Sequence, residues 1–310
     1  MNSHDAAALD CLAALADTGS FERAAQRLAI TQSAVSQRLR TLEAGLGRPL
    51  VVRSRPLRLT EPGKLLLRHA RQLQALRADL ARELGTAGDA QETLPIAVNA
   101  DSLATWVLPA LDELVHAGQR EGVGLEFIVD DQDFTHEWLR EGAVLGCVST
   151  VAQALRGCTA TLLGAMRYIA VASPDFVARE LPQGLNRANF ARLPWLVFNR
   201  KDDMHAAWVG RAFGIDAPRL TPRAVPSTEA HARATALGWG LGVMPEQMAA
   251  ERLARGELVP VHPEVHVDVL LYWHQWNLRL DDTRQPAART GTLDRIGQAL
   301  ARGAAAVLRS

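Results

Sequence analysis

The sequence has few of the features that mark secreted, membrane-spanning or disulfide-rich proteins. Its 310 residues include three cysteines, Cys11, Cys147 and Cys158, an odd and widely scattered set that fits a reducing compartment. No run approaches the roughly 18 apolar residues of a membrane span. The N-terminus is acidic and lacks the basic start of a signal peptide. We therefore expect a cytoplasmic protein without a membrane partner.

The sequence also lacks the short motifs of common enzymes. It contains no HExxH, CxxC, P-loop or GxSxG motif. The glycine-rich residues 238–242 follow a helical pattern, so they predict a turn and not a dinucleotide-binding loop. His262 and His266 are four residues apart, but no cysteine lies near them in sequence. We expect neither enzymatic activity nor a metal or cofactor.

The chain has no net charge, since 34 Lys+Arg residues balance 34 Asp+Glu residues. The two signs are nevertheless separated, with 13 basic and nine acidic residues in 1–90 and a net charge of −4 in the remainder. Within residues 21–60 the count is eight basic against two acidic residues. A basic segment on an acidic body indicates an anionic partner such as nucleic acid. The alternative is chance in an arginine-rich chain that has only two lysines, Lys64 and Lys201.

Hydrophobic spacing near the N-terminus predicts three helices, over residues 5–17, 21–28 and 32–46. Two residues separate the second helix from the third, and Thr31 is a suitable N-cap for the third. Helix, tight turn and helix at this spacing are typical of a DNA-binding helix-turn-helix.

The third predicted helix has two different faces. Val35, Leu39 and Leu42 repeat at helical spacing and should point inward. The opposite face is polar and has no acid before Glu43, unlike an ordinary solvated face with Glu–Lys pairs. Glutamine and arginine can read base edges, and serine can reach phosphates or bases. The residues predicted to contact DNA from this part of the chain are Thr31, Gln32, Ser33, Ser36, Gln37 and Arg40.

Residues 50–52 and 57–59 predict a small hairpin after the third helix. As a wing beside a recognition helix, it would place its arginines against the phosphate backbone or in the minor groove. These arginines are Arg53, Arg55 and Arg58.

A long helix is predicted from Thr60 to about Gly85, a length of roughly 36 Å. Leu66, Leu73 and Leu80 repeat every seven residues along it, as in a coiled coil. Such a seam packs either on its own domain or on a second copy of the chain. Its place between a basic head and an acidic body favours the second copy.

From residue 94 onward the pattern changes to buried strands separated by helices. The predicted strands are residues 94–100, 125–131, 144–150, 168–173, 195–199, 223–227 and 266–276, followed by a helix over about 285–308. This alternation indicates an α/β domain with mostly parallel sheets. About 215 residues are many for one sheet, so we expect two lobes with a cleft.

Residues 21–53, FERAAQRLAITQSAVSQRLRTLEAGLGRPLVVR, resemble the LysR-type transcriptional regulators, and the match continues through LTEPG at 59–63. That family usually has an arginine three residues after Arg53. Pro56 stands there in this chain, with Arg55 and Arg58 near it. Four further stretches resemble the ArgP/LysG branch of the family: VNADSLATWVLPAL (98–111), KDDMHAAW (201–208), PSTEA (226–230) and LLYWH (270–274).

The resemblance implies an N-terminal winged helix-turn-helix, mainly α, with a long linker helix, followed by a two-lobed α/β effector domain of periplasmic-binding-protein type. It implies a regulator, usually an activator, of arginine or lysine export or metabolism genes that responds to a basic amino acid. Its expected partners are double-stranded promoter DNA, RNA polymerase and further copies of the chain in a homodimer or homotetramer. The corresponding division is 1–60 for the DNA-binding head, 61–90 for the dimerising helix, 91–165 with 267–310 for lobe I, and 166–266 for lobe II.

The effector pocket is expected outside the carboxyl ends of the strands, where ligands bind in open α/β sheets. A cationic side chain needs one or two carboxylates, and an effector carboxylate suits a hydroxyl at a helix N-terminus. Acids and serines at such junctions can also be plain N-caps. The predicted effector-binding residues are Asp101, Ser102, Asp131, Asp203, Ser227 and Glu229.

Three other functions stay open at this point. One is a LysR-type regulator that answers a different small effector. Another is a solute-binding or enzymatic two-lobed domain, against which the missing export signal and the missing nucleophile–base motif argue. The last is a nucleoid-type architectural binder, which would bind DNA with low sequence preference and no response to a ligand.

Overall fold

Three helices and a short hairpin form the N-terminal head. The computed structural model describes residues 6–54, 57–85, 92–121, 123–130, 135–199, 201–278 and 291–309. The helices of the head are α1 (Ala6–Thr18), α2 (Phe21–Arg27) and α3 (Gln32–Leu46). They share one apolar core, which lies apart from the core of the remaining chain.

The third helix begins and ends where the sequence predicts. The Thr31 hydroxyl accepts a hydrogen bond from the Ala34 N–H at 3.2 Å, which satisfies one free donor at the helix start. Gly47 ends the helix in the left-handed conformation, with φ of 66°. Val35 and Leu39 are fully buried against the other helices of the head, so the polar face is turned outward.

The hairpin pairs β1 (Val51–Val52) with β2 (Arg58–Leu59) in antiparallel register, Val51 opposite Leu59. The tip of this hairpin, including Arg55, lies outside the described residues. The hairpin leads directly into α4 (Glu61–Glu83), which Thr60 caps by accepting from the Gly63 N–H at 3.1 Å.

The leucine seam of α4 divides into two parts. Leu66 and Leu73 pack against the core of the head. Leu80 and Leu84, toward the end of the helix, are 55% and 66% exposed. The first part of the seam therefore packs on its own domain, and only the last part leaves apolar side chains uncovered.

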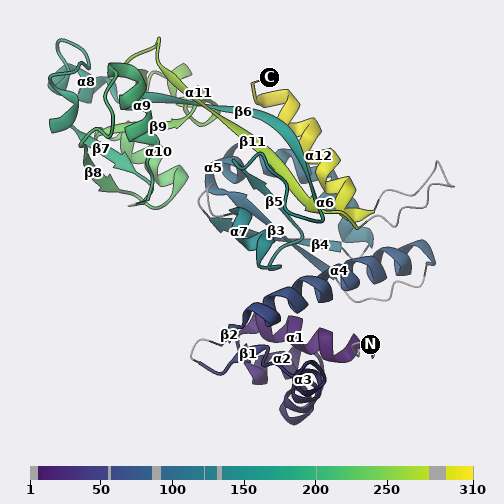
Figure 1. Cartoon of the computed structure of the whole chain (residues 1–310). Helices are drawn as coiled ribbons and strands as arrows, with labels where there is room; N and C mark the ends of the chain where they lie inside the picture. Colours follow the sequence, from purple (N-terminus) through teal and green to yellow (C-terminus); the bar gives the residue numbers. More distant parts are fainter. Residues whose placement is uncertain are drawn as a thin grey trace.

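Within the described residues, the rest of the chain forms one nine-stranded sheet that extends through two lobes (Figure 1). Its path runs in the order β4-β3-β5-β11-β6-β9-β7-β8, and β10 pairs with β6. The strands are β3 (Glu92–Asn99), β4 (Val123–Asp130), β5 (Gly146–Ser149), β6 (Cys158–Ala172), β7 (Pro194–Val197), β8 (Thr221–Ala224), β9 (Leu241–Pro245), β10 (Val259–Pro260) and β11 (His266–Trp276).

The sheet is parallel at its two ends and antiparallel in the middle, whereas the sequence pattern predicts mostly parallel pairing. In lobe I, β3 pairs in parallel with β4 and β5, and in lobe II, β7 does so with β8 and β9. The long strands β6 and β11 run antiparallel to each other through both lobes (Figure 1). One strand leaves lobe I and the other returns to it, so their directions must be opposite.

Helices cover both lobes. Those of lobe I are α5 (Ala100–Ser102), the π-helix η1 (Leu103–Val107), α6 (Leu108–Glu121), α7 (Thr135–Arg140) and α12 (Thr292–Val307). Those of lobe II are α8 (Pro174–Glu180), the 3-10 helix η2 (Phe190–Arg192), α9 (Met204–Phe213), α10 (Thr228–Ala236) and α11 (Glu246–Ala254). No helix in the described part of the chain has the length and apolar character to span a membrane.

Candidate functional site

A pocket lies between the lobes, where the parallel strands of both lobes end. Asn99 and Asp130 are the last residues of β3 and β4 in lobe I, and Phe198 follows β7 in lobe II. Tyr168 reaches the pocket from β6, the strand that joins the lobes. The remaining lining residues are Ala100, Asp101, Asp202, Met204, Thr228, His231, Val243, Met244, Pro245 and Met248. Such convergence of carboxyl ends is the usual place for a ligand in open α/β sheets.

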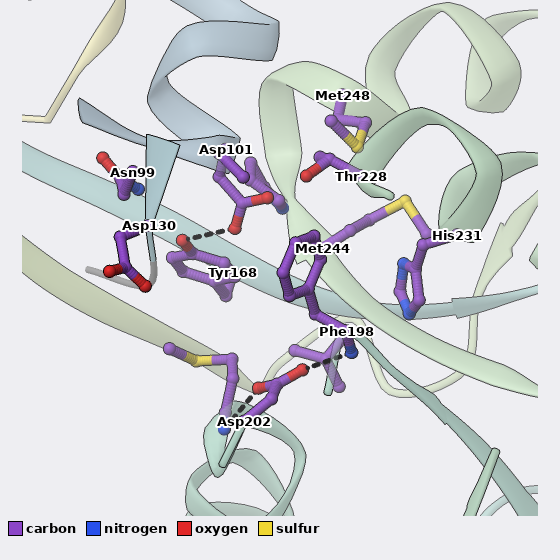
Figure 2. Close-up of a pocket in the computed structure, with 14 residues that line it drawn as sticks. Asn99, Asp101, Asp130, Tyr168, Phe198, Asp202, Thr228, His231, Met244 and Met248 are labelled. Carbon is purple, nitrogen blue, oxygen red and sulfur yellow. Dashed lines mark hydrogen bonds between the residues drawn. The ribbon is translucent and has the colours of Figure 1, made fainter. Parts of the chain in front are cut away.

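The pocket is partly open to solvent. About 600 Å³ of space not filled by protein atoms lies within it, including space that is open to solvent. Figure 2 shows acidic side chains facing this space from both lobes, with the methionines Met244 and Met248 on the other side. A pocket that combines apolar walls with a few polar groups is typical of small-molecule sites.

Two of the three acids belong to lobe I. Asp101, in the first turn after β3, accepts a hydrogen bond from the Tyr168 hydroxyl at 2.8 Å. Asp130, at the end of β4, accepts from the Trp138 Nε1–H at 2.9 Å. Each carboxylate is therefore fixed by an aromatic donor while it lines the pocket.

The third acid, Asp202, comes from the loop before α9 in lobe II. Its carboxylate accepts hydrogen bonds from the Phe198 N–H at 2.8 Å and the Met204 N–H at 3.1 Å (Figure 2). Burial alone would raise the pKa of Asp202, but contact with His205 and these two N–H groups lowers it to about 2. Asp202 is consequently an anion at every physiological pH.

Lobe II also provides neutral polar groups. His231 lines the pocket, and its Nε2 lies 2.8 Å from the Leu196 carbonyl oxygen, so this nitrogen carries the proton and donates it. Burial, with a smaller effect of nearby His205, lowers the pKa of His231 to about 4. The buried Thr228 hydroxyl and the buried Asn99 side-chain oxygen have no hydrogen-bond partner within the described structure. Unsatisfied buried polar groups beside a pocket are suited to a ligand.

The structure brings only part of the predicted effector set to this pocket. Asp101 lines it. Ser102 is fully buried beside it but is not in the lining, and Asp203 is exposed outside the lining. Ser227 caps α10 by accepting from the Ala230 N–H, as the N-cap alternative expects. Glu229 is exposed, and Asp131 lies outside the described residues.

Several residues that line the pocket were not predicted, although they are adjacent in sequence to predicted residues. Asp130 and Asp202 each precede a predicted acid by one residue, and Thr228 lies between two predicted positions. Tyr168 was predicted only as part of a strand. The pattern marked the correct strand ends, but the direction of each side chain depends on where the strand stops.

Among the described residues, those predicted to contact DNA lie on α3, at its cap and on the hairpin of the head. Gln32, Ser33, Gln37 and Arg40 on α3 are exposed, and Ser36 is half-buried. The Thr31 hydroxyl lies 2.9 Å from that of Ser33 and also forms the helix cap. On the hairpin, Arg53 and Arg58 are exposed.

The Arg53 guanidinium lies over the Phe21 ring, 5.5 Å from its centroid. This contact joins the hairpin to the start of α2.

Helix α4 touches both the head and lobe I. Arg71 donates to the Asp17 carboxylate of α1 and to the Ala143 carbonyl oxygen of lobe I. Lys64 donates to Glu141 at 2.6 Å in the same lobe. A direct chain of polar contacts therefore runs from the lobe that holds part of the pocket to the head.

Two family models match the chain. The model described as "Bacterial regulatory helix-turn-helix protein, lysR family" matches residues 7–64, and that of the "LysR substrate binding domain" matches residues 87–289. The chain belongs to the LysR family. It is therefore a LysR-type transcriptional regulator with a DNA-binding helix-turn-helix, as the sequence predicts.

Relatives within the family are similar over most of their length. The chain is 42% identical to the transcriptional regulator ArgP of Aeromonas salmonicida over 279 residues, which covers 90% of this chain and 92% of the relative. It is 41% identical to LysG of Mycobacterium tuberculosis over 291 residues, 92% and 93% of the two chains. These similarities confirm the predicted branch.

Solved structures agree with the two-lobed architecture. ArgP from Mycobacterium tuberculosis matches with a TM-score of 0.81 at 39% identity, over 98% of each chain. Full-length LysG from Corynebacterium glutamicum, solved with bound effector Arg, matches with a TM-score of 0.73 at 34% identity, over 99% of this chain and all of LysG.

Proposed function

We propose that this regulator binds arginine or lysine between its lobes and thereby controls genes for export or metabolism of basic amino acids. The observation that carries the proposal is the set of three acids, Asp101, Asp130 and Asp202, around one pocket. Charge-assisted hydrogen bonds to carboxylates are the strong way to hold a guanidinium or an ammonium group. LysG, a relative of similar fold, has been solved with arginine bound.

The two ends of such an effector require different partners. The cationic side chain suits the acids, of which Asp202 stays ionised because its pKa is about 2. The effector carboxylate suits the start of α10, where the unpartnered Thr228 hydroxyl lies beside the N-terminal N–H groups of the helix. Binding in this orientation would connect lobe I with lobe II.

The response to the effector is a shift between two arrangements of the lobes. An effector shifts the equilibrium only by its difference in affinity for the two states. Contacts from both lobes supply that difference, because only one arrangement lets Asp101 and Asp202 reach the same molecule. A movement of lobe I then shifts the head, because α4 contacts both through Arg71.

The residues of α3 and of the hairpin that the sequence predicts to contact DNA, including Arg55, are proposed to do so. Promoter DNA is the expected partner, and the exposed Leu80 and Leu84 of α4 suit pairing with a second copy in a homodimer or homotetramer. Contact with RNA polymerase belongs to the same proposal. We also propose that the domain boundaries lie where the sequence predicts them, after residues 60, 90, 165 and 266.

Calorimetric titration of the full chain with arginine, lysine and glutamine tests the effector class. Binding of either basic amino acid, and no binding of glutamine, is expected. A chain that binds none of these three, or that prefers glutamine, would contradict the basic-amino-acid effector and favour a regulator that answers a different small molecule.

Two neighbouring substitutions decide which acid binds. Asp202→Asn removes the buried charge and should weaken binding by about 2 kcal/mol or more, at least roughly 30-fold. Asp203→Asn changes an exposed residue outside the lining and should have little effect. A larger loss of effector affinity in Asp203→Asn than in Asp202→Asn would favour the predicted Asp203 as the binding acid. DNA affinity without effector should be unchanged in both.

A further inference from the structure

Behind the pocket, a buried histidine lies between the acid Asp202 and the strand β9. His205, in the first turn of α9, is 2% exposed and is not part of the pocket lining. Its Nε2 accepts a hydrogen bond from the Val243 N–H of β9 at 3.3 Å. Its Nδ1 lies 3.6 Å from the Asp202 Oδ2. One imidazole therefore faces a pocket acid on one side and a strand on the other.

The contacts of His205 assign its tautomer. A backbone N–H can only donate, so Nε2 of His205 must offer its lone pair to Val243. The ring proton then lies on Nδ1, which faces Asp202. The separation of 3.6 Å is longer than a hydrogen bond, and Nδ1 has no hydrogen-bond partner among the described residues. The Nδ1 proton therefore acts on the Asp202 carboxylate as a short electrostatic contact, while the opposite nitrogen is tied to the backbone.

Few other groups compete for this imidazole. The Trp195 ring packs edge-on at 6.0 Å between centroids, and the His231 ring of α10 lies at 5.9 Å. Among the described residues, Asp202 and His231 are the titratable groups that face His205. His231 has its own proton on Nε2, which donates to Leu196, so it does not replace the contact between His205 and Asp202.

We propose that His205 is the positioning residue of the effector pocket: it orients the Asp202 carboxylate toward the effector and ties that acid to β9. The inference rests on the proposed function. It adds that the affinity for a basic effector depends on a residue that does not touch the effector. The strand it holds, β9, also places Met244 and Pro245 in the lining, so His205 connects two walls of the pocket.

Loss of His205 should be visible in the dependence of binding on pH. Burial favours the protonated form of Asp202, and the contact with His205 is the largest effect opposing it. Without His205 the pKa of Asp202 rises, so more of the acid is neutral at mildly acidic pH. A cationic effector then binds less tightly as the pH falls, whereas the wild type keeps its charged acid.

The test compares three variants of the full chain by calorimetry with arginine and with lysine between pH 5 and pH 8. His205→Gln can place its carbonyl near the Nε2 position and accept from Val243, but it no longer presents a donor to Asp202. His205→Asn can keep a donor near the Nδ1 position. His274→Gln is the matched control, because His274 is also a fully buried histidine, bonded to the Val151 carbonyl oxygen of lobe I at 2.7 Å. Promoter binding and thermal unfolding show that each variant is folded.

We expect His205→Gln to bind the basic effector at least about twofold more weakly at pH 5 than at pH 8, with a flat profile in the wild type and in His274→Gln. His205→Asn should recover most of the affinity at pH 5. A folded His205→Gln variant with the wild-type affinity and a flat profile would overturn the inference. Equal losses in His205→Gln and His205→Asn at every pH would also overturn it, because they indicate packing alone. A wild type that binds no basic amino acid would instead overturn the proposed function, and the inference with it.

Discussion

The outward face of the head and the pocket between the lobes contrast in exposure and in charge. The head presents Gln37, Arg40, Arg53 and Arg58 to solvent on short secondary-structure elements. The pocket instead holds acids that are fixed by donors from the surrounding protein, such as Tyr168 for Asp101. A net charge of zero for the whole chain therefore conceals two regions of opposite charge, a basic surface on the head and an acidic pocket.

The difference fits the partner proposed for each surface. DNA is a large polyanion, so exposed arginines bind it by displacing counterions and need no fixed geometry of their own. A small cation must be removed from water, and that is favourable only where carboxylates are already oriented and their remaining lone pairs are satisfied. Asp202, which accepts from two backbone N–H groups, meets this condition.

Arg71 joins the two regions, and its removal should have the largest effect on the intact chain. Its side chain is 11% exposed and donates to Asp17 in the head and to Ala143 in lobe I. Hydrogen bonds of a charged group contribute about 1.5–3 kcal/mol each, so losing these two partly buried contacts should cost about 3 kcal/mol. Thermal unfolding of Arg71→Ala should show this loss. Arg77→Ala, an exposed arginine on the same helix, is the control and should change stability little. Equal stability of the two variants would mean that the head and lobe I are not coupled through Arg71.

Gln37→Ala tests whether the face of α3 reads bases. A lost base contact should reduce discrimination between operator variants by about 1–3 kcal/mol. Competition binding against a set of mutated operators measures this, and effector affinity should not change. If discrimination is unaffected at every position, then Gln37 is only part of a solvated surface.

Arg53→Ala tests the hairpin, with a smaller effect. A phosphate contact carries no sequence information, so affinity should fall for all DNA sequences alike. The slope of log K against log salt should become shallower by about one. Titrations at several salt concentrations give this slope, and identical slopes for Arg53→Ala and wild type would remove Arg53 from the interface.

The smallest effect expected is that of pH on the wild-type pocket. Asp202, with a pKa of about 2, and His231, with a pKa of about 4, keep their charge states from pH 8 to pH 5. The contribution of Asp202 is lost only as the pH falls through its lowered pKa, and repulsion by protonated His231 begins near pH 4. Calorimetry should therefore find constant affinity for arginine or lysine from pH 8 to pH 5. A steady decline over this range would show that a different group controls binding.

The same contrast explains what the sequence could and could not predict. Helix α3 matches its predicted bounds because its cap Thr31, its apolar stripe and Gly47 are all local signals. The final strand, 266–276, is likewise predicted correctly because residues 269–273 form an uninterrupted apolar run at its centre. The family is likewise predicted from local sequence, namely residues 21–53 and 59–63 of the head.

The pocket depends on long-range geometry instead. The first half of β6 was missed because its side chains are largely exposed and it pairs with β11, about a hundred residues away. Asp202 was passed over for Asp203 because sequence spacing does not show that the loop turns back to Phe198. A shift of one residue changes which side chain faces the pocket and which faces solvent.

If the acidic pocket selects a basic amino acid, a thermal-shift assay of the full chain against single amino acids should show that selection. Arginine or lysine at about 100 times its dissociation constant should stabilise the folded state by about 2.7 kcal/mol, which corresponds to a rise in Tm of a few degrees. Neutral and acidic amino acids should leave Tm unchanged. A rise in Tm with a neutral or acidic amino acid and none with arginine or lysine would show that the pocket does not select a basic amino acid.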